Sequence, residues 1–316
     1  MKDTVLITHR HCMDGTGCAI LFLKMGGLRE NIRFVGPESI HKVVTELCNT
    51  YSGHLLFVDV GVDEHEAELL NERGRGDVIL IDHHRTSIPL SKYSWANISA
   101  SKDNSAAGTA CGTLMMWEHY LLQHSEIAEY EGMARMIDDY DRWIHKNPMS
   151  QKFADLHTLI GHDMFINRFL DDSRVKLTDI DEKILNIDKK KKEEYFERKM
   201  NEVTVQTTRG IKIGVVLGNR YTSECCNHLL NNHPDGLDVA IMVDAEGNRA
   251  SLRSRKEGVD VSEIASLNGG GGHAAAAGFF LRGPHALKIQ EKFLKKLKLP
   301  IKRKRISRKK EANNQD

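Results

Sequence analysis

Histidine, cysteine and aspartate side chains follow three apolar runs in the first third of the chain. They are His9, Cys12 and Asp14 after TVLIT, Asp59 in HLLFVDV, and Asp82, His83 and His84 after DVILI. Imidazole nitrogen and carboxylate oxygen together suit divalent ions such as manganese, iron or zinc. Taken singly, each group could also be the polar, solvent-exposed end of a strand without any function. A metal site requires that the fold bring all three groups together.

A helical stretch further along the chain adds a fourth group of candidate ligands. The sequence GMARMIDDYDRW places Asp138, Asp139 and Asp141 within about one helical turn. One metal ion needs three or four ligands, and the four groups supply more than one ion uses. The surplus predicts two metals about 3.5–4 Å apart that share a carboxylate and stabilise both the attacking and the leaving oxygen of a phosphoryl displacement. The nucleophile would be a water whose pKa the metals lower.

Alternating strands and helices are expected to position these groups. The segments TVLIT, IRFVG, HLLFVDV and DVILIDHH are typical of buried strands, and helical patterns lie around AILFLKM, HKVVTELCN and DEHEAELLNER. Such alternation indicates a parallel sheet with crossover helices. Ligands of such sheets bind outside the carboxyl ends of the strands, so the side chains after the first, third and fourth strands are expected at one edge. Residues 107–142 predict a mostly helical continuation.

A second, smaller α/β unit is predicted after the charged helical stretch 181–202. Its expected strands are IKIGVVLG, DVAIMVDAEG and NRASLRSR. In NGGGGHAAAAGF, four glycines before His273 leave backbone N–H groups free to bind an anion. We expect the following alanines to form a helix whose N-terminus adds its dipole, and Arg253 and Arg255 to lie on one face of a strand. The alternative is a flexible loop beside a packing helix.

Length and composition predict a soluble, cytoplasmic protein of two domains. The 316 residues suffice for two cores, and neither a signal-peptide pattern nor a membrane-spanning run is present. The six cysteines lack zinc-finger spacing, which indicates thiols. Residues 298–316 hold eight basic and two acidic residues, a net charge of +6, so residues 1–297 carry −5 of the total of +1. The basic tail is predicted to contact nucleic acid, to act as a targeting signal or to remain a solvated end.

Five motifs of the chain resemble those of the DHH phosphoesterases and of their companion DHHA1 domain. In order along the chain they are HRHCMDG, FVDVG, IDHH, IDDYD and GGGGHAAAAGF. The resemblance implies two α/β domains: a parallel-sheet DHH domain at 1–180, a helical linker at 181–205 and a smaller DHHA1 domain at 206–297, with the active site in the cleft between the domains and a basic, disordered tail at 298–316. It also implies dependence on divalent metal. We expect two Mn²⁺, with Mg²⁺, Zn²⁺ or Fe²⁺ as alternatives.

The resemblance also implies roles for single residues. One metal would be held by His9 with Asp59, and a second by Asp14, Asp59, His83 and Asp139, with Asp59 bridging. Asp82 would support this set, and His84 would face the scissile phosphate. In the second domain the substrate would be bound by Arg253, Gly270, Gly271, Gly272 and His273.

The first motif departs from the family's pattern. Family members usually carry Asp-x-Asp there, but Cys12 stands where the first Asp is expected and His9 is not at the commonest spacing. Three outcomes are open. Cys12 is itself a ligand, with softer metals favoured; His11 substitutes for the missing carboxylate; or the first metal site is weakened. In the last motif, Asp141 is the rival of Asp139.

The leading interpretation is a metal-dependent phosphodiesterase that hydrolyses short single-stranded oligonucleotides or dinucleotides to mononucleotides. A cyclic dinucleotide phosphodiesterase and a phosphatase of small nucleotides are alternatives within the same class. An alternative of another class is a nucleic-acid-binding protein whose altered first motif has impaired its metal site. The candidate ligands that remain favour an enzyme. No membrane partner is expected, and a homodimer is left open.

Overall fold

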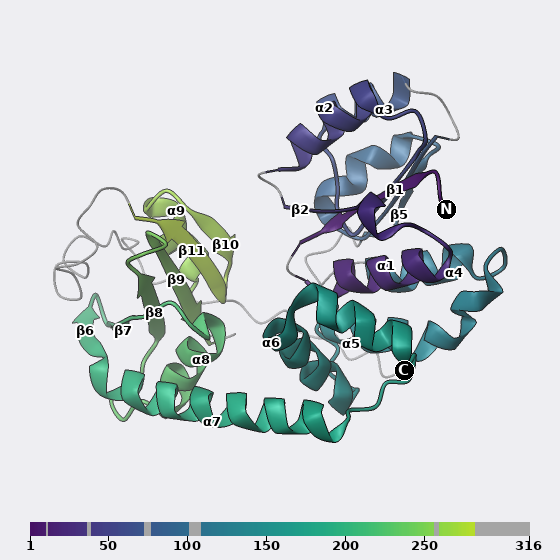
Figure 1. Ribbon diagram of the computed structural model, residues 1–316. Coiled ribbons are helices and arrows are strands. Elements are labelled where there is room, and N and C mark those ends of the chain that lie inside the picture. The colour runs from purple at the N-terminus through teal and green to yellow at the C-terminus, as the bar shows by residue number, and fades with distance from the viewer. Residues whose placement is uncertain (11, 37–38, 73–76, 101–108, 256–258, 282–316) are drawn as a thin grey trace, which may run out of the picture. The chain divides into compact units, whose positions relative to one another are not determined.

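The computed structural model describes the chain except residues 11, 37–38, 73–76, 101–108, 256–258 and 282–316 (Figure 1). By its internal contacts the chain divides into two compact units, Met1–Asn186 and Ile187–Asp316. The division falls within helix α7 (Asp179–Glu202), which the charged stretch of the sequence predicted. His11 and the basic tail, both of which carried predictions, lie outside the described residues.

The first unit is built on a parallel sheet with the strand order β2-β1-β3-β4-β5. Its strands are β1 (Thr4–His9), β2 (Ile32–Val35), β3 (His54–Val58), β4 (Val78–Asp82) and β5 (Ala96–Ile98). In the register of the sheet, Thr8 pairs with Val58 and Val58 with Ile81. The carboxyl ends of β1, β3 and β4 therefore lie side by side, as the sequence predicted.

Helices cover both faces of this sheet (Figure 1). On one face pack α1 (Met13–Lys24), α4 (Gly112–Tyr120), α5 (Glu131–Asp141) and α6 (Pro148–Asp171), and on the other α2 (Ile40–Thr50) and α3 (Glu64–Glu72). The short 3-10 helices are η1 (Arg29–Asn31), η2 (Arg85–Lys92) and η3 (Ser125–Tyr130). Alternate residues of β1 enter the two cores, Leu6 the first and Val5 and Ile7 the second, which explains why the strand is apolar throughout.

The second unit has a mixed six-stranded sheet with the order β10-β11-β9-β8-β7-β6. Its strands are β6 (Thr204–Thr208), β7 (Ile211–Leu217), β8 (Val239–Asp244), β9 (Arg249–Ser254), β10 (Gly271–His273) and β11 (Ala276–Phe280). Among the described strands of this sheet, only β7 and β8 pair in parallel, and the crossover helix α8 (Thr222–Asn232) connects them. Helix α9 (Val261–Leu267) packs on the core that β7, β8, β9 and β11 share.

The prediction of a helix after His273 is wrong. The segment Ala276–Phe280 forms strand β11, which pairs antiparallel with β9 and with β10. Its burial alternates, with Ala277 and Phe279 buried in the core, so the segment follows the period of a strand rather than that of a helix. Alanine ranks highest in helix propensity, but the free-energy difference per residue is small, and pairing with β9 outweighs it.

The α/β class, the parallel sheet of the first unit and the smaller second unit agree with the prediction. Among the described residues, no helix combines the length and the apolar composition that crossing a membrane requires.

Candidate metal centre and active site

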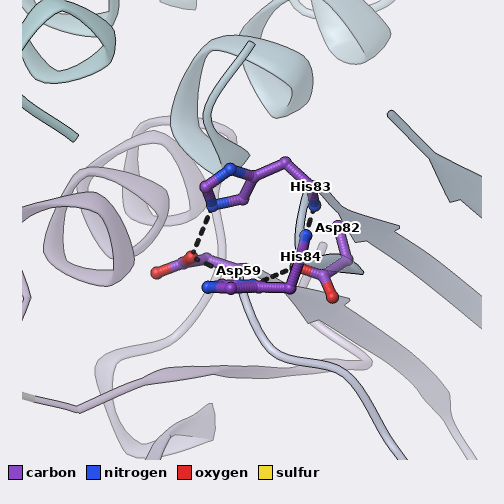
Figure 2. A group of neighbouring side chains, drawn as sticks. All are labelled: Asp59, Asp82, His83 and His84. Carbon is purple, nitrogen blue, oxygen red and sulfur yellow. Dashed lines mark hydrogen bonds and ion pairs between the residues drawn. The ribbon is translucent and has the colours of Figure 1, made fainter. Parts of the chain in front are cut away.

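The ends of β3 and β4 bring two aspartates and two histidines together (Figure 2). Asp59, Asp82, His83 and His84 each offer an atom within 4.8 Å of the others. Figure 2 shows the imidazole of His83 directed at Asp59, with Nε2 3.2 Å from Oδ1. Asp59 has a φ of +59°, the left-handed region that costs a non-glycine residue roughly 1–3 kcal/mol and is common at functional sites.

Asp82 orients the histidine pair that follows it. Its carboxylate accepts hydrogen bonds from the backbone N–H of His83 at 2.9 Å, from Nδ1 of His84 at 2.7 Å and from the hydroxyl of Ser87. Burial raises the pKa of Asp82, but the hydrogen bonds from His84 and Ser87 outweigh burial and hold the pKa below its usual value. Asp82 is therefore ionised and fully buried, and its charge is used to hold His84.

His84 is the one member of this group that reaches the surface. Its side chain is 47% exposed, whereas those of Asp59 and His83 are 3% exposed. Burial lowers the pKa of His84, but the hydrogen bond to Asp82 outweighs it and raises the pKa. Because Nδ1 is engaged by Asp82, Nε2 is the ring nitrogen left to meet a substrate.

A second group links β4 to the helices α1 and α5. The Nε2 atom of His83 lies 3.6 Å from Oδ2 of Asp14 and 3.6 Å from Oδ2 of Asp141. These three residues offer ligand atoms within 4.8 Å of one another. Burial and the neighbouring Asp14 raise the pKa of Asp141 to about 6. For the same two reasons the pKa of Asp59 is well above its usual value.

The third group contains the cysteine of the first motif. His9, Cys12 and Asp59 offer ligand atoms within 4.8 Å of one another. The Cys12 sulfur lies 3.2 Å from Nδ1 of His9 and 3.1 Å from Oδ2 of Asp59. Cys12 is also the N-cap of α1, where its sulfur accepts from the N–H of Gly15 at 3.1 Å. Burial and the charge of Asp59 raise the pKa of the thiol well above its usual value in the metal-free protein.

The support for Asp14 was not foreseen from the sequence. Its carboxylate accepts the backbone N–H groups of Gly112 at 2.8 Å and Thr113 at 2.7 Å, the first residues of α4. A helix N-terminus stabilises a negative charge. A Cβ at Gly112 would lie 2.7 Å from Cβ of Asp59, so this position requires glycine. The sequence ACGT around these residues resembles no anion-binding motif, so nothing in it could have signalled the contact.

The three aspartates of α5 do three different things. Asp141 joins the metal-ligand group. Asp138 accepts from the N–H of Cys111 at 2.8 Å and pairs with Arg142 at 3.2 Å. Asp139, which the sequence analysis chose as the ligand, faces the other way and accepts from the N–H groups of Lys146 and Asn147 and from the hydroxyl of Ser150, at 2.6–3.1 Å. The geometry therefore favours Asp141, the rival candidate, over Asp139.

The residues of this centre fit a divalent metal. Three carboxylates, those of Asp14, Asp59 and Asp141, surround one imidazole nitrogen of His83 within 3.6 Å. Burial and the like charge of Asp14 raise the pKa of two of them, those of Asp59 and Asp141, and a bound cation would remove this electrostatic cost. The other nitrogen of His83, Nδ1, is buried without a hydrogen-bond partner among the described residues. Oxygen, nitrogen and one sulfur donor form a set typical of first-row metals.

The chain is similar in sequence to two known proteins. Oligoribonuclease NrnB from Bacillus subtilis is 28% identical over 280 residues, which are 84% of this chain and 70% of that protein. An uncharacterised protein, R106, from Acanthamoeba polyphaga mimivirus is 26% identical over 88% of this chain and 68% of that protein. No protein-family model matches the chain.

A solved structure extends the likeness to the whole fold. The pGpG-specific phosphodiesterase PggH from Vibrio cholerae aligns over 93% of this chain and 98% of its own, with a TM-score of 0.52 and 15% identity. The resemblance to the DHH phosphoesterases is confirmed. The DHH-like motifs of the first unit are those that converge at the strand ends, and GGGGH lies in the second unit.

In the second unit the glycine-rich motif forms the exposed strand β10 rather than a loop. Gly270, Gly271, Gly272 and His273 are all exposed, and β10 pairs only with β11 among the described strands. Gly272 has a φ of +139°, and a Cβ there would lie 2.6 Å from Cα of Ala277. A Cβ on Gly271, by contrast, would meet nothing within 4 Å. Gly272 is thus required by the fold, whereas Gly271 leaves open space above the backbone.

Arg253 lies in β9, and its register partner in β11 is Ala276. Its Nε donates to the hydroxyl of Ser223 at 3.0 Å, in the first turn of α8. Arg255 follows the strand and donates from Nη2 to the carbonyl of Leu230 at 2.6 Å. The two arginines therefore have different partners, and only Arg253 belongs to the strand itself.

Proposed function

We propose that the protein is a metal-dependent phosphodiesterase that hydrolyses short single-stranded oligonucleotides to mononucleotides. The observation that carries the proposal is the convergence of three ligand groups in which Asp59 and His83 each belong to two. A structural ion pair would balance its charges, whereas among the described residues the carboxylates of Asp14, Asp59 and Asp141 all lie within 3.6 Å of one imidazole nitrogen. The similarity to an oligoribonuclease supports short oligonucleotides as the substrate class.

Two metal sites follow from the grouping. We assign His9, Cys12 and Asp59 to the first, and Asp14, Asp59, His83 and Asp141 to the second, with Asp59 shared. Two divalent ions bound in this way would lower the pKa of a water and neutralise the charge of the phosphodiester. We expect Mn²⁺ in the carboxylate-rich second site, while the sulfur of Cys12 shifts the first site toward softer ions such as Zn²⁺ or Fe²⁺.

The surface histidine binds the reacting phosphate in this proposal. His84 is held by Asp82, which raises its pKa and favours the imidazolium form. An imidazolium with its Nε2 toward solvent donates a charged hydrogen bond to a phosphate oxygen, and such bonds are roughly twice as strong as neutral ones. Asp82 acts through His84 and does not itself meet the substrate, because it is fully buried.

The second unit is proposed to hold the substrate through Gly270, Gly271, Gly272, His273 and Arg253. A glycine strand lets a phosphate approach the backbone closely, and guanidinium suits phosphate oxygens. The exposure of β10 and the open space above Gly271 support this role.

Hydrolysis of a defined panel tests the proposal. Metal-stripped protein is resupplied with Mn²⁺, Mg²⁺, Zn²⁺ or Fe²⁺ and given a labelled dinucleotide, a heptamer, a long single strand and a cyclic dinucleotide. We expect the linear short substrates to be converted to mononucleotides, fastest with Mn²⁺. Preferential cleavage of the cyclic compound would make the protein a cyclic dinucleotide phosphodiesterase instead. Binding of the heptamer without cleavage under every metal would contradict the enzyme proposal.

A further inference from the structure

One tryptophan next to the metal-ligand group is exposed to solvent. Trp143 has 67% of its surface accessible, whereas Trp95 and Trp117, the other two tryptophans of the chain, are 8% and 7% exposed. An indole ring has a large apolar face, and one that is exposed beside a candidate active site is available to bind a ligand. We propose that Trp143 binds a nucleobase of the substrate by stacking, an inference that rests on the oligonucleotide function proposed above.

The first argument is position. Trp143 lies two residues after Asp141, so their Cα atoms are at most ~7 Å apart. Asp141 is itself 3.6 Å from His83 in the metal-ligand group. A side chain anchored at this distance lies within the span of one nucleotide whose phosphate is at the metal centre. A base-binding residue of a nuclease has to stand this close, because base and phosphate belong to the same small substrate.

The second argument is the backbone that carries the ring. Trp143 and His145 have φ values of +58° and +51°, the left-handed region that costs non-glycine residues roughly 1–3 kcal/mol each. Such conformations persist only where the surroundings impose them, and they gather at binding sites. Neither residue is a glycine or an asparagine, the types that would be found if only a turn were needed here.

Asp139 imposes this conformation. Its carbonyl oxygen accepts from the N–H groups of Ile144 at 2.9 Å and His145 at 3.2 Å. Its carboxylate accepts from the N–H groups of Lys146 and Asn147. The hydroxyl of Ser150 donates to the same carboxylate at 2.6 Å. The buried Asp139 thus fixes the backbone of the segment that carries the exposed Trp143.

The third argument is the surroundings of the ring. His145 meets Trp143 edge to face, with ring centroids 4.3 Å apart and planes at 88°. This contact restrains the indole, while two thirds of its surface stays open. Lys146, the residue after His145, is exposed, and among the described residues its side chain forms no ion pair. Aromatic rings together with basic side chains bind single-stranded nucleic acid without strong sequence preference.

The test compares two substrates that differ only in a base. Full-length protein with Trp143→Ala is assayed on a dinucleotide and on the matching dinucleotide that lacks one base. Base stacking is worth about 1–3 kcal/mol by alanine substitution, so KM for the intact dinucleotide should rise about 5- to 150-fold, whereas KM for the dinucleotide that lacks the stacked base should not change. Trp143→Phe should recover most of the loss. Leu122→Ala is the matched control, since Leu122 is an apolar residue of the same unit that is 97% exposed.

A second readout needs no hydrolysis. A nucleoside monophosphate should quench tryptophan emission in the wild type and in the Leu122→Ala variant, but not in Trp143→Phe. Equal loss on both dinucleotides would overturn the inference, because the segment would then act on the metal centre. An unchanged KM, or a shift in oligomeric state on Trp143→Ala, would overturn it as well. Quenching in a protein that cleaves no oligonucleotide would leave the base site standing and contradict the proposed function.

Discussion

In the first unit the candidate ligands are buried carboxylates and imidazoles, whereas in the second the glycine-rich strand β10 is exposed along its length. At the first place the reactive groups are side chains, and Asp59 and His83 are 3% exposed. In the second unit, strand β10 offers backbone N–H donors and open space, because Gly271 has no side chain and a Cβ there would meet nothing within 4 Å. The carboxylates of the first unit repel one another, and a bound metal ion would relieve this repulsion. The glycine-rich strand of the second unit has no such repulsion.

The difference teaches how each place can fail. Removing a charge from the first unit changes metal affinity and activity before it changes the fold, because the carboxylates there repel one another. Adding a methyl group to a glycine of the second unit changes no charge and acts through volume and backbone conformation. Changes in the first unit should therefore produce the larger effects on catalysis.

The largest effect is expected from the matched pair Asp141→Asn and Asp139→Asn. Loss of groups that merely support metal ligands costs about 10- to 100-fold, so loss of a ligand should cost more. We expect Asp141→Asn to lower kcat/KM more than ~100-fold and to reduce the bound metal measured by elemental analysis. Asp139→Asn should keep the metal and raise KM, since it releases the segment that carries Trp143. Loss of metal from Asp139→Asn with retention in Asp141→Asn would reverse the assignment.

This pair also marks where sequence reasoning stops. The convergence of β1, β3 and β4 was predictable, because parallel strands present their carboxyl ends at one edge. The choice between Asp139 and Asp141 was not. Two residues apart on a helix, they point about 200° away from each other, and the rotation of α5 that decides which one faces the site is set by how Met133, Met136 and Ile137 pack. The alanines after His273 misled for a related reason, because pairing with β9 is a long-range contact that local propensity does not contain.

The next effect concerns the glycines of β10. Gly272→Ala should destabilise the second unit by roughly 1–3 kcal/mol, because its φ of +139° and the backbone of Ala277 both oppose a side chain. Gly271→Ala meets neither obstacle and should leave the melting temperature unchanged while raising KM for a dinucleotide several-fold. Thermal melting and steady-state kinetics on both variants separate the two. If Gly271→Ala binds substrate as the wild type does, β10 does not contact the phosphate.

A smaller effect is expected in the stability of the metal-free protein. The pKa of Asp141 is raised to about 6, so its protonated form is favoured by folding; this contribution is complete below pH ~4 and is lost as pH rises through about 6. Asp141→Asn mimics the protonated group. The metal-free variant should therefore exceed the metal-free wild type in stability at pH 7, on the order of 1–3 kcal/mol, and the gap should close toward pH 4. Denaturant titrations at the two pH values measure it, and a gap that widens toward pH 4 would contradict the burial of like charges at this centre.

The smallest change in activity is expected from substitution of Cys12. Here the comparison is between the two proposed metal sites of the first unit. The sulfur lies between His9 and Asp59 at 3.2 and 3.1 Å, so the first site differs from the second by one soft donor. A metal ion would displace the thiol proton despite the raised pKa, since coordination deprotonates cysteine. The cobalt-loaded wild type should show a near-ultraviolet sulfur-to-metal charge-transfer band, and this band should be absent in Cys12→Asp. The variant should retain Mn²⁺-dependent activity within about tenfold of the wild type. Its metal preference should shift from Zn²⁺ toward Mn²⁺. Because this band reports the Co–S bond directly, its absence from the wild type would remove Cys12 from the ligand set and leave His9 and Asp59 to hold the first site without it.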